Sequence, residues 1–118
     1  MNSDIDFNDF KKVFFFGIGG IGISAVARMF LLEGKIVVGS DISMSEVTDG
    51  LVEAGAKIEK GQSLSLVPKD TELVIYTAAL ENFDAPLLAE IKKLKIPSIS
   101  YSEALGIISK NKYTIAVS

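Results

Sequence analysis

The run Val13-Phe14-Phe15-Phe16-Gly17-Ile18-Gly19-Gly20-Ile21-Gly22 decides the fold of this chain. Its first four residues are all apolar, which is typical of a central parallel strand covered on both faces. The glycines that follow fit the pattern G-x-G-x-x-G, and Gly20 to Glu33 has the composition of a helix that Gly34 ends. Because apolar residues lie nearly all round this helix, we expect it to be well buried.

The same alternation of short apolar runs and helical patterns continues to the end of the chain, as in successive βαβ units. We expect further strands at Ile36–Gly39, Lys57–Lys60, Leu73–Thr77, Ser98–Ser100 and Tyr113–Val117. Ser43 and Glu46 form a predicted capping box for the second helix, and Asp84 is the predicted cap of the third. The expected fold is α/β: a Rossmann-like, doubly wound, mainly parallel sheet of about five strands with helices on both faces.

Composition excludes several classes of function. The chain has 118 residues and a net charge of −3, and it contains no cysteine and no histidine. A metal site built on thiolate or imidazole is therefore not expected, and neither is a catalytic residue of those types. An acidic chain without a basic run is a poor match for nucleic acid. No apolar stretch is long enough to span a membrane, so we expect no membrane partner and a cytoplasmic location.

The glycine run has the placement that phosphate binding requires, directly after a strand and directly before a helix. One glycine allows the tight turn, and the next lets the backbone approach a phosphate without a Cβ in the way. The last glycine lets the helix pack closely on the strand. The first N–H groups of the helix lack partners within it, so they can bind an anion without any lysine. The alternative is a strand-to-helix turn that binds nothing.

Two further strand ends supply candidate residues. Asp41 follows the second strand, about twenty residues beyond the glycines, where a carboxylate can meet ribose hydroxyls or the N–H of a base. Its alternative role is that of a turn or capping aspartate. Thr77, Ala78 and Ala79 follow a later strand, and such small residues leave room over the crevice of the sheet.

Several motifs in this order resemble the Mur ligases. The resemblance rests on Gly17–Ser24, Gly39-Ser40-Asp41, Leu51 with Gly55-Ala56, Val74–Leu80, Ile96-Pro97, Ser102–Leu105 and Ile115–Ser118. The chain departs from the family pattern at three places. Gln62 stands where the family has histidine, Asn82–Pro86 replaces a D-N-P-E turn, and Ser100-Tyr101 stands where arginine is usual.

The resemblance implies a longer enzyme that joins L-alanine to UDP-N-acetylmuramate in peptidoglycan synthesis, using ATP and magnesium through an acyl phosphate. It implies that the first domain holds the UDP part of that substrate. The implied contacts with the diphosphate are Gly19, Gly20, Ile21 and Gly22, and Gly17 belongs to the same UDP site. Ser40, Asp41 and Ser43 would lie near the uridine, and Thr77, Ala78 and Ala79 would line the same crevice.

On this interpretation residues 1–111 form the UDP-binding domain, and residues 112–118 are the first strand of a central ATPase domain. The central and C-terminal domains of the longer enzyme would then be the partners of this chain. No residue here is assigned to catalysis, no cofactor is expected on this chain, and we expect it to be inactive alone.

Two alternative functions remain open from the sequence. The glycine run and Asp41 suit the adenosine ribose of NAD(H) equally well, as in the Rossmann module of a dehydrogenase or a regulator. Within the family, the ligase that reattaches tripeptide to UDP-N-acetylmuramate uses the same sugar nucleotide.

Overall fold

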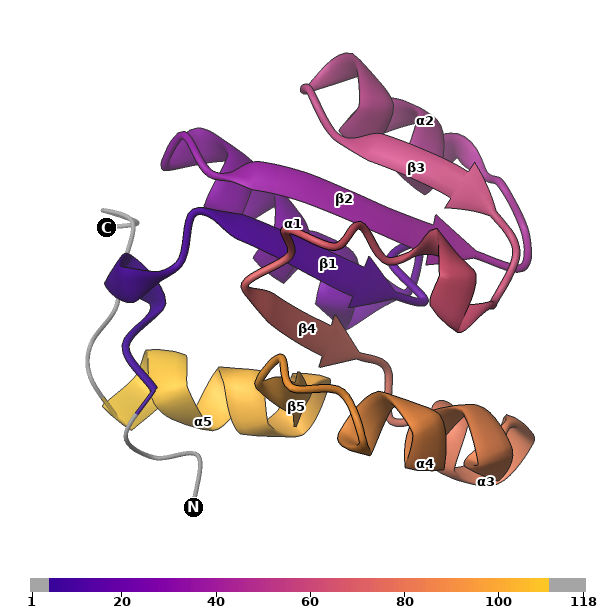
Figure 1. Ribbon diagram of the computed structural model, residues 1–118. Helices are drawn as coiled ribbons and strands as arrows, with labels where there is room; N and C mark the ends of the chain where they lie inside the picture. The colour runs from indigo at the N-terminus through magenta and orange to yellow at the C-terminus, as the bar shows by residue number, and fades with distance from the viewer. Residues whose placement is uncertain (1–4, 111–118) are drawn as a thin grey trace.

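A parallel sheet of five strands forms the centre of the computed structural model, which describes residues 5–110 (Figure 1). The strands are β1 (Lys12–Phe16), β2 (Ile36–Asp41), β3 (Lys57–Lys60), β4 (Leu73–Tyr76) and β5 (Ser98–Ser100). Their spatial order is β3-β2-β1-β4-β5, and every neighbouring pair is parallel. This order is that of a Rossmann-like sheet, so the predicted fold is confirmed.

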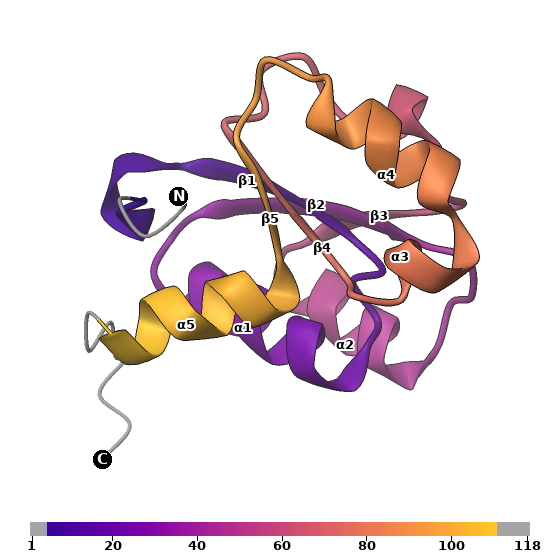
Figure 2. The ribbon, with the colours of Figure 1, turned by 90° about the horizontal axis from the view of Figure 1, so that it is seen from below.

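Helices cover both faces of the sheet (Figure 2). They are α1 (Ile21–Leu32), α2 (Glu46–Glu53), α3 (Leu80–Phe83), α4 (Ala85–Lys92) and α5 (Tyr101–Lys110), with short 3-10 helices at Phe7–Asp9 and Leu64–Leu66. One face carries α1, α2 and α5, and the other carries α3 and α4. Within residues 5–110, none of the helices has the length and apolar content that crossing a membrane requires.

Strand β1 separates two hydrophobic cores because its side chains alternate between the faces of the sheet. Val13 and Phe15 belong to the core under α1 and α5, whereas Phe14 and Phe16 belong to the core under α4. All four are at most 1% exposed. A strand with such residues is stable only where both faces are covered, as the apolar run predicted.

Helix α1 is less buried than its composition suggested. Ile23, Val26 and Phe30 are at most 4% exposed and face the sheet. Ile21 is 92% exposed and Leu32 is 74% exposed, so the expectation of a well-buried helix is wrong at both ends. With 3.6 residues per turn, only one side of the helix can contact the sheet, and its terminal residues extend past that contact.

The start of the second helix also differs from the prediction. Helix α2 has Ser45 as its N-cap, and its capping box pairs Ser45 with Thr48 rather than Ser43 with Glu46. The Thr48 side chain is buried, and its hydroxyl accepts from the N–H of Ser45 at 2.8 Å. The predicted pattern requires Glu or Gln three residues after the serine, so it selected Ser43 and missed Ser45, whose partner is the buried Thr48.

Other predicted boundaries have mixed outcomes. Asp84 caps α4 by accepting from the N–H of Leu87, and Gly34 follows α1 with φ of +87°, so both predictions are confirmed. Helix α3, directly after β4, was not predicted. The predicted strand Tyr113–Val117 lies outside the described residues and stays a prediction.

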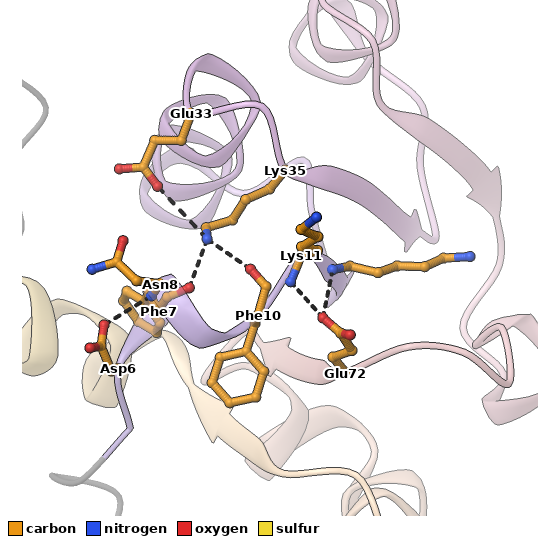
Figure 3. Close-up of polar contacts among 9 residues, drawn as sticks. Asp6, Phe7, Asn8, Phe10, Lys11, Glu33, Lys35 and Glu72 are labelled. Carbon is orange, nitrogen blue, oxygen red and sulfur yellow. Dashed lines mark hydrogen bonds and ion pairs between the residues drawn. The ribbon is translucent and has the colours of Figure 1, made fainter.

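The amino end of the sheet is closed by polar contacts of the first segment (Figure 3). The Lys35 ammonium donates to the carbonyls of Phe7 and Phe10 at 2.7 and 2.8 Å. The ring of Phe7 meets that of Phe30 on α1 edge-on, with centroids 5.1 Å apart. These contacts fix the entry of the chain into β1.

Glu72 makes further polar contacts at the amino end of the sheet, and these contacts give a prediction about the pH dependence of stability. Its carboxylate accepts from the backbone N–H groups of Lys11 and Lys12, which hold the pKa of Glu72 below its ordinary value. A lowered pKa stabilises the folded chain above the ordinary carboxyl pKa, and this contribution disappears as the pH falls through the folded value. We expect Glu72→Gln to lower the melting temperature at pH 7 and to have less effect at pH 3.

Thermal unfolding followed by circular dichroism at both pH values measures this difference. Glu90→Gln on α4 is the control for the loss of one exposed negative charge. An equal loss at both pH values would contradict the role assigned to the Glu72 carboxylate.

Candidate functional site

A pocket of about 400 Å³ opens at the carboxyl edge of the sheet, where β1, β2 and β4 end. The chain runs outward from β1 to β2 and β3, and then crosses to β4 on the other side of β1. Such a reversal of strand order leaves a crevice in which α/β folds commonly bind ligands. The pocket is lined by Gly17, Gly20, Asp41, Ile42, Gln62, Thr77, Ala79, Leu80 and Phe83.

The floor of the pocket is a tight turn that only glycine can make. Gly17 has φ of +75°, and its N–H donates to the carbonyl of Ser40 at 2.8 Å. A Cβ on Gly17 would lie 2.6 Å from Cγ2 of Thr77, which is closer than real Cβ atoms approach. The tight turn that the glycine pattern predicted is confirmed, and it fits against both β2 and the segment after β4.

Asp41 clamps this turn from the end of β2. One carboxylate oxygen accepts from the N–H of Gly19 at 2.8 Å, and the other accepts from the N–H of Ser43 at 3.1 Å. A Cβ on Gly19 would lie 2.9 Å from the first of these oxygens. The contacts of Asp41 are thus those of a turn aspartate, the alternative role considered for it. A carboxylate has about four lone-pair directions, so acceptor capacity remains toward the pocket that Asp41 lines.

The start of α1 presents open backbone donors. Gly20 is its N-cap and supplies no side-chain hydrogen bond. The N–H groups of Ile21, Gly22 and Ile23 have no acceptor among residues 5–110. Unpaired donors at a helix start carry partial positive charge and attract anions. The exposure of Ile21 leaves this turn of the helix accessible to a ligand.

Gly22 serves a different contact from the one expected. A Cβ there would overlap the hydroxyl and ring of Tyr101, the first residue of α5. Gly22 therefore allows α5 to pack against the first turn of α1, instead of bringing α1 close to a strand. A separate close contact occurs within the sheet at Gly39 of β2, where a Cβ would lie 2.7 Å from Cδ1 of Ile18 and 2.9 Å from the carbonyl oxygen of Phe15 on β1.

The structure brings together only part of the predicted set. Gly17, Gly20, Asp41, Thr77 and Ala79 line the pocket, whereas Gly19, Ile21, Gly22, Ser40, Ser43 and Ala78 do not. The Ser40 side chain is fully buried, and its Oγ has no hydrogen-bond partner among the described residues. What Ser40 supplies to the turn is its carbonyl, which accepts from two backbone N–H groups.

The sequence interpretation missed Ile42, Gln62, Leu80 and Phe83. Gln62 follows β3 by two residues, and Ile42 directly follows β2. The rule that selected Asp41 could have found both, because the carboxyl ends of parallel strands meet at one edge. Leu80 and Phe83 belong to α3, which no periodic pattern indicated.

Charge in the pocket comes from a single side chain, since Asp41 is the one ionisable residue among those that line it. Within the described part of the chain, no group of three or more His, Cys, Asp or Glu side chains could hold a metal ion. The other lining residues are two glycines, the uncharged polar side chains of Gln62 and Thr77, and the apolar side chains of Ile42, Ala79, Leu80 and Phe83. The arrangement can bind an anion next to an apolar ring.

The strand order, the glycine turn and the open helix start at the reversal point define a Rossmann-type domain. Residues 12–113 match the family model described as "Mur ligase family, catalytic domain". The chain belongs to the Mur ligase family.

Curated relatives give the likeness in detail. The chain is 46% identical over 114 residues to the UDP-N-acetylmuramate–L-alanine ligase of Clostridium kluyveri. The matched region covers 96% of this chain and 25% of that protein. The chain is 44% identical over 117 residues to the protein of the same name from Acetivibrio thermocellus, covering 98% and 24%. The chain thus spans about a quarter of the length of these relatives.

Solved structures agree with this likeness. The UDP-N-acetylmuramate–alanine ligase of Thermotoga maritima superposes with a TM-score of 0.73 at 31% identity, covering 86% of this chain and 23% of that one. The murein peptide ligase of Psychrobacter arcticus has a TM-score of 0.72 at 20% identity, covering 85% and 20%. At that identity the second likeness supports the fold alone.

The clamp by Asp41 gives a prediction about the glycine turn. We expect Asp41→Ala to destabilise the folded chain by about 1–3 kcal/mol, because the variant loses two hydrogen bonds to a charged acceptor. Amide hydrogen exchange at Gly19 and Ser43 should become faster than in the unmodified chain. Asp41→Asn keeps one acceptor oxygen, so its effect should be smaller. Unchanged exchange at Gly19 in Asp41→Ala would show that the bond does not hold the turn.

Proposed function

We propose that this chain is the UDP-N-acetylmuramate-binding domain of an ATP-dependent ligase that adds L-alanine to that substrate in peptidoglycan synthesis. The single observation that carries the proposal is the row of open N–H groups at the start of α1, beside the pocket at the reversal point of the sheet. The 46% identity to a UDP-N-acetylmuramate–L-alanine ligase supports the choice of substrate.

The diphosphate binds at the N–H groups of Ile21, Gly22 and Ile23, where the helix dipole favours negative charge. This mode of binding suits an acidic chain, because it needs no lysine or arginine. The uridine occupies the adjoining pocket, where Asp41 faces the ribose hydroxyls and Thr77 and Ala79 leave space for the nucleoside. Ser43 and Ala78 lie next to this pocket without lining it.

ATP and magnesium belong to the remaining part of the longer enzyme. Among the described residues, no group of three or more His, Cys, Asp or Glu side chains could hold a metal ion. Residues 1–111 form the substrate domain, and residues 112–118 lead into the ATPase domain as its first strand. The contribution of this chain is to bind and orient the sugar nucleotide. Its location in the cytoplasm stays a prediction.

Nuclear magnetic resonance titration tests the substrate class. On addition of UDP-N-acetylmuramate we expect the backbone amide signals of Ile21, Gly22 and Ile23 to shift, because they donate to the diphosphate. NAD should bind more weakly than the UDP-sugar. Preferential binding of NAD would replace the proposal with the dehydrogenase or regulator alternative. Turnover of ATP by the chain alone, with alanine and the UDP-sugar present, would contradict its assignment as a binding domain.

A charge change at Ile21 tests the diphosphate position. We expect Ile21→Glu to weaken UDP binding about tenfold, since its carboxylate would lie beside the phosphates. Ile21→Gln introduces a side chain of the same shape as glutamate but without its charge, so this variant should bind UDP nearly as well as the unmodified chain. Ile21→Lys should bind UDP more tightly. Isothermal titration calorimetry gives the three affinities.

The folded state should tolerate all three Ile21 variants. The side chain is 92% exposed, and an acidic residue in the first turn of a helix is favourable to the helix dipole. Melting temperatures therefore separate loss of binding from loss of folding. Equal affinities of the Glu and Lys variants would place the diphosphate elsewhere.

A further inference from the structure

Phe83 differs from most phenylalanines of this chain in its exposure. It is 83% exposed, whereas the phenylalanines of β1 and α1 are buried to within 1%. It also lines the pocket at the carboxyl edge of the sheet. An exposed phenyl ring lacks the hydrophobic stabilisation that burial gives, so a ligand that covers it on the pocket wall would gain that stabilisation.

A second exposed apolar side chain lines the same pocket from another strand end. Ile42 is 62% exposed and directly follows β2, whereas Phe83 ends the helix that follows β4. Strands β2 and β4 flank β1, so Ile42 and Phe83 belong to segments on either side of β1, and both line the pocket. Gly20, the N-cap of α1, lines the same pocket, so the open donors of α1 lie next to these two side chains.

The backbone that carries Phe83 is held at both ends. Leu80, at the start of α3, is 1% exposed and packs in the core with Phe16 and Tyr76. On the other side, Asp84 accepts from the Leu87 N–H at 3.2 Å and from the Gln62 side-chain amide at 3.0 Å. Because both ends of this segment are held, its backbone loses little conformational freedom when a ligand covers the Phe83 ring.

We propose that Phe83 stacks on the nucleobase of the bound nucleotide and that Ile42 covers the opposite face of the base. This inference rests on the proposed function and adds to it a contact that determines affinity for the nucleoside end of the ligand. A nucleoside diphosphate presents a flat ring at one end and two phosphates at the other. The pocket and the helix start match that order, with apolar walls next to backbone donors.

Stacking recognises any flat base, because every base has a π-face. Phe83 therefore contributes affinity for the nucleoside end of the ligand and none for the phosphates. Removal of a stacking ring should weaken binding of a nucleotide but leave binding of pyrophosphate unchanged. Removal of a residue that only supports the fold of the site should weaken both.

The test compares UDP with inorganic pyrophosphate on the 118-residue chain, on Phe83→Ala and on Phe83→Tyr. We expect Phe83→Ala to weaken UDP binding about tenfold, in the range known for loss of one base–aromatic stack. Its affinity for pyrophosphate should be unchanged, and Phe83→Tyr should keep the affinity for UDP. The H5 and H6 signals of uracil should move upfield on binding to the chain and to Phe83→Tyr, and should not do so with Phe83→Ala. Leu32→Ala, a change at another exposed apolar side chain at the far end of α1, is the matched control and should alter neither affinity.

Each contrary result has a distinct meaning. If Phe83→Ala binds UDP as tightly as the unmodified chain, the stacking inference is overturned and the proposed function stands. If Phe83→Ala loses UDP and pyrophosphate equally, the ring acts through the shape of the site, and the inference is again overturned. Failure of the unmodified chain to bind either ligand would overturn both the inference and the proposed function.

Discussion

The hydrogen bond from the N–H of Gly19 to the carboxylate of Asp41 holds the glycine turn in place, at a distance of 2.8 Å. The turn is also tied to β2 by the carbonyl of Ser40, which accepts from the N–H groups of Gly17 and Ile18. The end of β2 thus determines the path of the chain after β1. Since α1 begins directly after this turn, the direction of its open donors depends on the same contacts.

This arrangement explains how an acidic chain can present a site for an anion. The one ionisable side chain that lines the pocket is negative, but its two oxygens are engaged by backbone N–H groups of the turn and of Ser43. Attraction for an anion comes instead from the unpaired N–H groups of α1. Such donors are fixed by the helix and need no reorganisation when a ligand arrives.

The position of the pocket depends on the whole sheet. Strand β1 occupies the centre of the sheet, and the side chains of its one valine and three phenylalanines pack in the cores on both faces. Chain reversal around β1 leaves the crevice between the segments that follow β2 and β4. The helix α3 then supplies the wall that carries Phe83. The pocket at this edge therefore depends on the packed fold, although the open donors belong to one local turn.

The sequence by itself determined the strands, the glycine turn, the helix after it and the proximity of Asp41, because each depends on local periodicity or on the common edge of parallel strand ends. It could not determine the partner of Gly22, since Tyr101 lies far along the chain and contacts it only through the packing of α5. The tertiary structure alone decided that the Ser40 side chain points into the core and that Phe83 lines the pocket. The direction of a side chain at a strand or helix end depends on neighbouring elements, and residue order does not specify it.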